Sequence, residues 1–409
     1  MPEDPDADDF ERRVREQYDL EPVGSDNATL AAGPPDREVY EAPITPTEDF
    51  FVLNHYPTPD VDAEDWTVSL SGAVDEPAEL TMNDVVDDYP TVTVTHTMEC
   101  AGNGRADFES VDDEPARYVQ WDDEAVATAR WTGTPLSAVL DDHGADGSWL
   151  TAVGGDAPDD PGADVFARSL PMAKVRRDCI LAYRMNGEPL PAEHGFPARI
   201  IAPGWYGVNS VKWLAELHVM DGMMTGAEWE RYTRWQQDQY RLKPTGDADP
   251  AEHESVDAFE VADQLAAGVE EPYTYDQSVM SLVAYPDDGD VVSPGPDGRL
   301  EVVGVAWAGD DRVERVEASA DGGETWHEGT FMAPPSSGVW RPFRCALDLA
   351  AGDYRLVSRA TDERGRRQPA RPGRPGDAVV ADDDESPWNR EGYTNNAYES
   401  FGVEFAVEE

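Results

Sequence analysis

The segment "TVTVTHTMECAGNGR", residues 91–105, joins a strand pattern to a turn that contains a single cysteine. Residues 91–99 alternate in the way that indicates a β-strand. Cys100 then opens a turn of small residues, which lets a bulky group approach the backbone closely. Arg105 ends the turn, and a positive charge there lowers the pKa of a nearby thiol. We therefore ask whether Cys100 is a reactive thiol, a metal ligand or an ordinary core residue.

The three possibilities differ in what must surround Cys100. A cysteine hydrolase needs a base beside the thiol, but His96, four residues earlier in the same strand, is about 13 Å away at about 3.3 Å per residue. A buried residue at the end of a strand needs no partner. A soft metal bound through one thiolate needs ligands from another source, because Cys179 and Cys345 lie in apolar, strand-like segments and no CxxC pair exists.

The charge of the chain is strongly negative. Its 409 residues include 85 acidic and 31 basic residues, with a net charge of −54, and only three of the basic residues are lysines. The acidic residues are spread over the whole chain, which favours adaptation to a salt-rich cytoplasm over an acidic surface for one cationic partner. Nucleic-acid binding is not expected, because phosphate contacts require basic patches.

The termini and the hydropathy suggest a location. No apolar run approaches the roughly 18 residues of a membrane-spanning helix, so no membrane insertion is expected. The first residues, "MPEDPDADDFERRVREQ", have neither a cationic start nor an apolar stretch. We therefore expect a cytoplasmic protein with free cysteines.

The pattern along the chain predicts an α+β protein in four parts. The parts are an acidic N-terminal arm (1–40), a mixed α/β catalytic domain (41–245), an acidic linker (246–277) and an all-β, immunoglobulin-like sandwich (278–409).

Local signals predict several individual elements. Helices are expected at 9–20, at 81–89 with Thr81 as the cap, and at 134–144 with Thr134 as the cap and Gly144 as the stop. Strands are expected at 66–74, on both sides of the glycine-rich loop within 198–220, and at 299–309, 312–329 and 352–365, with a hairpin turn at "ADGGETW" (320–326).

The segment "CAGNGR" (100–105) resembles the CAGNRR signature of the sulfite oxidase family of molybdenum enzymes. Further segments resemble the family's elements in the same order. These are "ITPTEDFFVLNHYPTPDVD" (44–62), "WDDEAVATARWTGTPLSAVL" (121–140), "CILAYRMNGEPLPAEHGFPARIIAPGWYGVNSVKWL" (179–214), "RVERVEASADGGETW" (312–326) and "WNREGYTNNAYESFGVEF" (388–405). The resemblance covers nearly the whole chain and implies a molybdenum atom carried by molybdopterin, with a C-terminal dimerisation domain.

The resemblance also implies roles for individual residues. Cys100 is the expected molybdenum ligand, Arg105 the substrate-anion contact, Tyr183 the active-site tyrosine and Trp121 a pocket wall. The expected contacts to molybdopterin are Asn54, His55, His194, Arg199, Ser210 and Lys212. The other histidines, His96, His143, His218, His253 and His327, are interpreted as structural.

The sequence departs from the family pattern at three positions that bear on the anion pocket. Leu53 replaces the arginine of FFVRNH, and Gly104 replaces the first arginine of CAGNRR. Glu391 replaces the arginine of WNxRG, while Arg390 lies one residue earlier. A dianion would find fewer charged contacts, each worth about 1.5–3 kcal/mol.

The predicted function is oxygen-atom transfer, with sulfite oxidation to sulfate as the leading hypothesis. The 40 residues of the arm are too few for the family's haem domain, so electrons are expected to leave to a separate acceptor. Reduction of a sulfoxide, an N-oxide or nitrate is the alternative within enzymes. A binding or scaffold protein that carries no cofactor is the alternative from another class. The sandwich domain predicts a homodimer.

Overall fold

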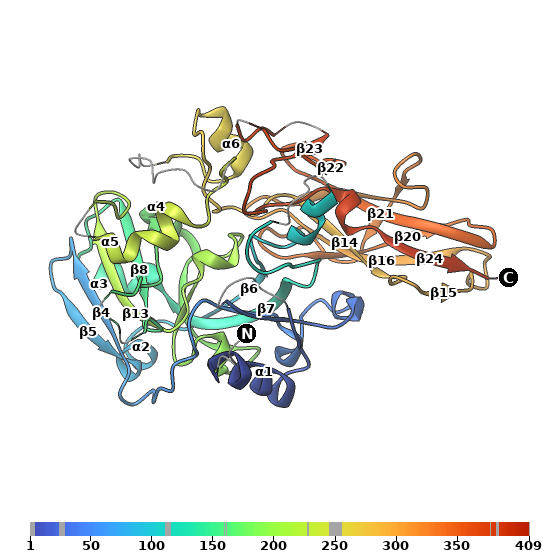
Figure 1. The fold of residues 1–409 in the computed structure, drawn as a ribbon. Coiled ribbons are helices and arrows are strands. Elements are labelled where there is room, and N and C mark those ends of the chain that lie inside the picture. The colour runs from blue at the N-terminus through green and yellow to red at the C-terminus, as the bar shows by residue number, and fades with distance from the viewer. Residues whose placement is uncertain are drawn as a thin grey trace.

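The computed structural model describes two domains that lie side by side (Figure 1). It describes residues 5–23, 29–110, 116–158, 160, 162–226, 229–244, 256–376, 378–381 and 384–408. The first domain mixes helices and strands, and the second is an elongated pair of β-sheets. The predicted α+β chain with a C-terminal sandwich is therefore confirmed. Within the described ranges, no helix is both long and apolar enough to cross a bilayer.

Two sheets form the centre of the first domain. One has the order β11-β10-β7-β6, with β12 also paired to β10, and the other has the order β5-β4-β13-β8-β9. The first sheet consists of β6 (Val92–Glu99), β7 (Val126–Pro135), β10 (Ile180–Met185), β11 (Glu188–Pro189) and β12 (Arg199–Ile201). The second consists of β4 (Thr67–Gly72), β5 (Ala78–Thr81), β8 (Trp149–Gly154), β9 (Ala167–Pro171) and β13 (Leu214–Met220).

Short helices pack beside these sheets. They are α2 (Met82–Asp87), α3 (Leu136–Asp142), α4 (Met172–Asp178) and α5 (Glu230–Thr233), the last continued by the π-helical turn η7 (Arg234–Asp238). The predicted cap of α2 is confirmed, because Thr81 and Asp84 form a reciprocal capping box. The predicted cap of α3 is wrong: Thr134 belongs to β7, and its hydroxyl donates to the carbonyl oxygen of Val85. The stop at Gly144 agrees with its φ of +62° just after the helix.

The second domain is a sandwich of two sheets with their apolar faces together. The sheets have the orders β14-β16-β20-β19 and β15-β24-β21-β17-β18, and a small parallel pair joins β22 to β23. The strands are β14 (Met280–Tyr285), β15 (Val291–Val292), β16 (Leu300–Trp307), β17 (Val313–Ser319), β18 (His327–Glu328), β19 (Thr330–Phe331), β20 (Arg341–Leu347), β21 (Gly352–Asp362), β22 (Arg371–Pro372), β23 (Glu385–Ser386) and β24 (Val403–Val407). The hairpin predicted at 320–326 joins β17 to β18, with positive φ at Gly322 and Gly323.

Part of the predicted linker (246–277) packs against the first domain. Its residues 246–255, and with them His253, lie outside the described residues, whereas 256–277 contain α6 (Val261–Ala266) and two tyrosines, Tyr273 and Tyr275, buried in the core of the first domain. The four-part division of the chain stays a prediction.

The second domain holds the strand that leads to Cys100. The backbone nitrogen of Trp340 donates to Oγ1 of Thr97 at 2.7 Å, and Nε1 of Trp307 donates to Oε2 of Glu99 at 3.1 Å. Burial raises the pKa of Glu99 to about 8. Because β6 is fixed along its last residues, the turn that follows it starts from a rigid support.

Candidate active site

The turn after β6 is held by hydrogen bonds around Cys100. The backbone nitrogen of Cys100 donates to the carbonyl oxygen of Ala125 at 2.9 Å, and Oδ1 of Asn103 accepts from the nitrogen of Ala125 at 3.1 Å. Gly104 has a φ of +74°, and a Cβ there would lie 2.4 Å from Cζ of Phe401 in the second domain. A side chain at position 104 would therefore require the ring of Phe401 to move and would be strained at this φ, so glycine suits this position in this chain.

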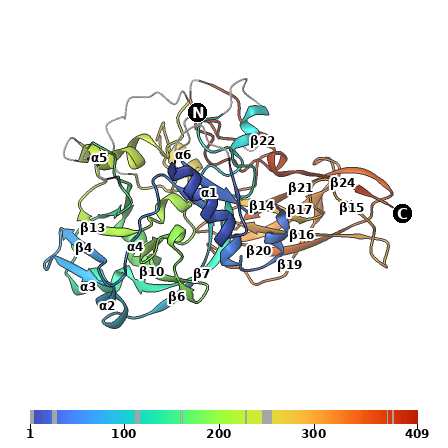
Figure 2. The same cartoon turned by 60° about the horizontal axis from the view of Figure 1, so that its bottom comes forward.

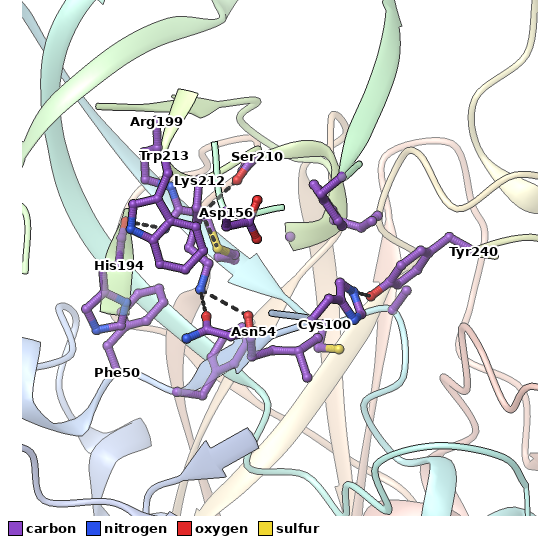
Figure 3. A pocket seen from close by; sticks show the side chains of 18 residues that line it. Phe50, Asn54, Cys100, Asp156, His194, Arg199, Ser210, Lys212, Trp213 and Tyr240 are labelled. Atoms are coloured by element: carbon purple, nitrogen blue, oxygen red, sulfur yellow. Dashed lines mark hydrogen bonds between the residues drawn. The ribbon is translucent and has the colours of Figure 1, made fainter. Parts of the chain in front are cut away.

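Cys100 lies at the junction of two adjacent cavities. The space between the lining atoms, part of it open to solvent, is about 690 Å³ for the first cavity and about 410 Å³ for the second. Cys100, Leu53, His55 and Tyr240 line both. Figure 3 shows the first cavity, with its labelled residues Phe50, Asn54, Cys100, Asp156, His194, Arg199, Ser210, Lys212, Trp213 and Tyr240.

Nine of the ten residues predicted for the site line one of these cavities. Asn54, His55, Cys100, His194, Arg199, Ser210 and Lys212 line the first cavity, and His55, Cys100, Arg105 and Trp121 line the second. The tenth, Tyr183, does not: its hydroxyl lies 3.0 Å from Oγ1 of Thr91, an exposed contact. The structure places a different tyrosine, Tyr240, at the junction.

Two buried cations lie in the wall of the first cavity. The ammonium of Lys212 donates to Oδ1 of Asn54 and to the carbonyl oxygens of Leu53 (3.0 Å) and Glu193 (2.9 Å). Burial, followed by the charge of Arg199, lowers the pKa of Lys212 to about 7. Burial lowers the pKa of Arg199 to about 9, although its guanidinium donates to the carbonyl of Ser210 at 2.8 Å. Because two buried positive charges lie in the wall of the first cavity, binding of an anion in that cavity is favourable.

Several polar atoms of the first cavity have no hydrogen-bond partner among the described residues. They are Nδ1 of His55, Nε2 of His194, Nε of Arg199 and Oδ1 of Asp156. Burial lowers the pKa of His55 to about 3 and that of His194 well below its ordinary value, so both imidazoles are neutral at pH 7. Buried polar atoms normally find partners. The first cavity therefore has the donors and acceptors that a polar, anionic ligand needs.

Arg105 is the buried cation of the second cavity. Its Nε donates to the carbonyl oxygen of Glu391 and its Nη1 to that of Val119, each at 2.7 Å, and its guanidinium lies 5.1 Å from the ring centre of Tyr393. Its Nη2 packs against the backbone of Gly102, where a Cβ would lie only 2.4 Å away. A guanidinium held this firmly is suited to bind an oxyanion.

Aromatic side chains form most of the remaining wall of the second cavity. They are Tyr118, Trp121, Trp235, Tyr240 and Tyr393. Arg234 also lines this cavity, but its side chain is half exposed and pairs with Asp164 at 2.9 Å. The second cavity therefore combines one buried guanidinium with apolar walls.

The departures at Leu53 and Glu391, and the shifted Arg390, have distinct structural consequences. Leu53 places an apolar side chain at the junction of the cavities. Glu391 is buried, its pKa is raised by burial, and its backbone carbonyl supports Arg105. Arg390 is not among the described residues that line either cavity, and its backbone nitrogen donates to the carbonyl of Lys243.

Comparison with known proteins defines the class. Residues 55–228 match the family model "Oxidoreductase molybdopterin binding domain", and residues 271–403 match "Mo-co oxidoreductase dimerisation domain". The chain is thus a molybdopterin-dependent oxidoreductase with a dimerisation domain.

Individual relatives narrow this class. The chain is 33% identical to sulfite oxidase of Gallus gallus over 353 residues, and 31% identical to mitochondrial sulfite oxidase of Homo sapiens over 381 residues. These alignments cover 83% and 90% of this chain, and 71% and 63% of the two relatives. The chain belongs to the sulfite oxidase family, which confirms the predicted enzyme class and its molybdenum–molybdopterin cofactor.

A solved structure shares the fold. The sulfane dehydrogenase SoxCD from Paracoccus pantotrophus is similar with a TM-score of 0.71 and 24% identity, over 97% of this chain and 92% of that chain. At this identity the likeness shows the two-domain fold alone.

The residues of the first cavity fit molybdopterin. Among the described residues, no three His, Cys, Asp or Glu side chains lie close enough together to hold a metal ion. A metal bound at Cys100 therefore needs ligands from outside the protein, as the dithiolene of molybdopterin supplies. The unpartnered atoms of His55, His194, Arg199 and Asp156 match a pterin that carries many hydrogen-bonding nitrogens and a phosphate.

Several of these wall residues were not predicted. Asp156 and Phe166 line the first cavity, while Tyr118, Arg234, Gln239 and Tyr393 line the second, with Tyr240 at the junction. One feature of the sequence could have indicated some of these residues. The run "WQQDQYRLKP" (235–244), which includes Gln239 and Tyr240, is rich in aromatic and amide side chains and follows a helix.

Proposed function

We propose that this protein oxidises sulfite to sulfate and passes the electrons to a separate acceptor. The balanced reaction is sulfite plus water giving sulfate, two protons and two electrons. One observation carries the proposal: Cys100 and the buried guanidinium of Arg105 line the same cavity, so an anion bound to Arg105 lies beside the metal ligand. The names of the chicken and human relatives support the same substrate.

In the proposed site, the cofactor is held on the first-cavity side. Cys100 would ligate the metal as a thiolate; burial raises its pKa and Arg105 opposes that rise, so metal binding must complete the deprotonation. Arg199, Lys212, His55, His194, Asn54 and Ser210 would hold the pterin and its phosphate. When bound, the molybdenum–molybdopterin centre supplies oxygen-atom transfer with its two-electron redox change.

The remaining residues act on the substrate side. Arg105 orients the anion through Nη2, because its other donors are engaged by the backbone carbonyls of Glu391 and Val119. Tyr240 keeps its proton, since burial raises its pKa. With the hydrogen of neutral His55 on Nε2, which lies 2.6 Å from the Tyr240 oxygen, the hydroxyl is a donor at the junction. Trp121 and Tyr393, both buried, line the same cavity as Arg105 and would limit the access of water to its guanidinium, which strengthens the guanidinium–anion attraction.

Partners and location belong to the same proposal. The dimerisation domain supports a homodimer, which light scattering in molar KCl tests; a monomer there would contradict it. Three buried free cysteines and the net charge of −54 support a salt-rich cytoplasm. The external electron acceptor is a separate protein.

The decisive experiment is anaerobic addition of sulfite to protein of verified molybdenum content in molar KCl, following reduction of ferricyanide. Saturable reduction that disappears in Cys100→Ser supports the proposal. No reduction by protein that carries molybdenum excludes sulfite.

Reductive oxygen-atom transfer to a sulfoxide, an N-oxide or nitrate is the second candidate. The apolar Leu53 at the junction and the aromatic walls favour a less charged substrate than sulfite. Reoxidation of chemically reduced protein by dimethyl sulfoxide or nitrate, without sulfite turnover, would select this direction.

A further inference from the structure

The N-terminal helix α1 (Pro5–Gln17) contacts Glu193, the residue that precedes the cavity-lining His194, although the helix precedes both family models. Figure 2 shows the helix crossing the face of the molecule. Nε of Arg13 donates to Oε1 of Glu193 at 2.8 Å. The arginine side chain is 23% exposed, whereas that of Glu193 is 1% exposed. A surface helix therefore neutralises a carboxylate inside the molecule.

Glu193 links this contact to the buried lysine. Its Oε2 accepts from Nδ2 of Asn54 at 2.7 Å and from the hydroxyl of Thr58. The other end of the Asn54 amide, Oδ1, accepts from the ammonium of Lys212, which also donates to the backbone carbonyl of Glu193 at 2.9 Å. The chain of contacts from Arg13 to Lys212 thus passes through two buried side chains.

The rest of the arm supports the same wall. Strand β1 (Glu21–Pro22) pairs with β2 (Leu30–Gly33), which pairs with β3 (Val52–Asn54), so that Leu30 lies opposite Asn54. Phe10 and Val14 of α1 pack in one apolar cluster with Leu30 and Val52. The ring of Tyr18 contacts the edge of His194 at 5.7 Å between centres.

Charge explains why Arg13 matters to the cavity. Glu193 attracts the ammonium of Lys212, and an anion in the cavity would have to compete with that attraction. Arg13 offsets the negative charge from the far side, which leaves the charge of Lys212 for an anionic ligand. Removing one partner of a buried pair leaves the other uncompensated.

We propose that Arg13 is a positioning residue for the phosphate-bearing pterin, acting through Glu193, Asn54 and Lys212. The acidic N-terminal arm is then part of the cofactor site and not only a solvated extension. This inference rests on the proposal that the cavity beside Lys212 holds the cofactor.

The test measures loss of cofactor from the holoprotein. Wild type, Arg13→Ala, Arg13→Lys and Arg12→Ala are diluted into molar KCl with excess phosphate, and molybdenum and pterin fluorescence per chain are followed with time. Arg12→Ala is the matched control, because Arg12 lies on the same helix and pairs only with Asp9 and Glu16 within the described residues. We expect Arg13→Ala to lose cofactor about tenfold faster, Arg13→Lys to restore much of the retention, and Arg12→Ala to match wild type.

Repeating the Arg13→Ala substitution in a Glu193→Gln protein separates the charge effect of Arg13 from its packing. In Glu193→Gln, the carboxylate is absent, so adding Arg13→Ala should no longer accelerate cofactor loss. Equal acceleration in both backgrounds, or equal loss in Arg12→Ala and Arg13→Ala, would overturn the proposal. If Arg13→Ala does not fold, Arg13→Gln enters the same comparison.

Lys212→Met distinguishes this inference from the site assignment. Faster loss in Lys212→Met with no effect of Arg13 rejects only the role of Arg13. Unchanged retention in Lys212→Met rejects the placement of the cofactor itself.

Discussion

The hydroxyl of Tyr240 lies 2.6 Å from Nε2 of His55, and this pair stands where the two cavities meet. His55 is stacked on Trp235 with ring centres 4.0 Å apart, so its imidazole cannot turn freely. Burial keeps the imidazole neutral by lowering its pKa to about 3 and keeps the phenol protonated by raising its pKa. One rigid, uncharged pair therefore connects the cofactor side to the substrate side.

Tyr240→Phe removes the hydroxyl at this junction. We expect kcat/KM for sulfite to fall by about a hundredfold, the usual cost of one donor aimed at a reacting oxygen. The molybdenum content should change little, because the phenyl ring keeps its packing. Tyr183→Phe is the control, since the hydroxyl of Tyr183 contacts, within the described residues, only Oγ1 of Thr91, and its kinetics should match wild type. Steady-state kinetics on molybdenum-matched samples decide; equal effects at both positions would return the active-site role to Tyr183.

Arg105→Gln removes the only buried guanidinium among the described residues of the second cavity. We expect the KM for sulfite to rise by tenfold or more, because a charge-assisted hydrogen bond is worth about 1.5–3 kcal/mol. Arg234→Gln is the control at the same cavity, where the exposed guanidinium already pairs with Asp164. Its KM should rise by less than about threefold. A larger effect from Arg234 than from Arg105 would move the anion site to the mouth of the cavity.

The pKa of Lys212 makes the stability of the cofactor-free protein depend on pH. In the folded state this pKa is about 7, against an ordinary value of 10.5. Between these values the unfolded chain binds a proton that the folded chain does not. The free energy of unfolding should therefore rise with pH from about 7 to 10.5, by at most about 1.4 kcal/mol per pH unit.

Urea unfolding of cofactor-free protein in molar KCl measures this dependence. Lys212→Met should flatten the rise, whereas Lys243→Met, which removes a lysine paired with Asp238, should keep it. An unchanged slope in Lys212→Met would mean that Lys212 stays charged when folded. Bound cofactor should weaken the slope in wild type, because its phosphate favours the charged ammonium.

The sequence predicted the fold where local pattern and tertiary structure agree. The capping box at Thr81 and the hairpin at 320–326 depend on residues close together in the chain, and both are present. Thr134 failed as a cap because β7 continues through it and pairs it with Leu181 of β10. A strand ladder with a distant partner outweighed a local capping signal.

The same contrast between local motifs and tertiary packing applies to the residues of the site. Asn54, Cys100 and Lys212 stand in contiguous motifs and could be found by reading them. Tyr240 and Asp156 reach the cavities from segments without a recognisable motif, so their roles depend on tertiary packing. The contact of Arg13 with Glu193 joins residues 180 apart in sequence, and no local pattern encodes it.

Leu53→Arg tests whether missing charge limits sulfite binding. Leu53 lines both cavities, and its backbone carbonyl is already fixed by Lys212, so a new guanidinium would enter beside Cys100 without moving the strand. If sulfite is the substrate, a second guanidinium should lower its KM by about tenfold, the worth of one charge-assisted contact. Leu53→Gln adds hydrogen bonding without charge and should leave the KM near that of wild type. Because a neutral substrate gains nothing from added charge, the KM for dimethyl sulfoxide should not fall in Leu53→Arg. A fall for neither substrate, in protein with full molybdenum content, would show that Arg105 alone supplies the charge that the reaction needs.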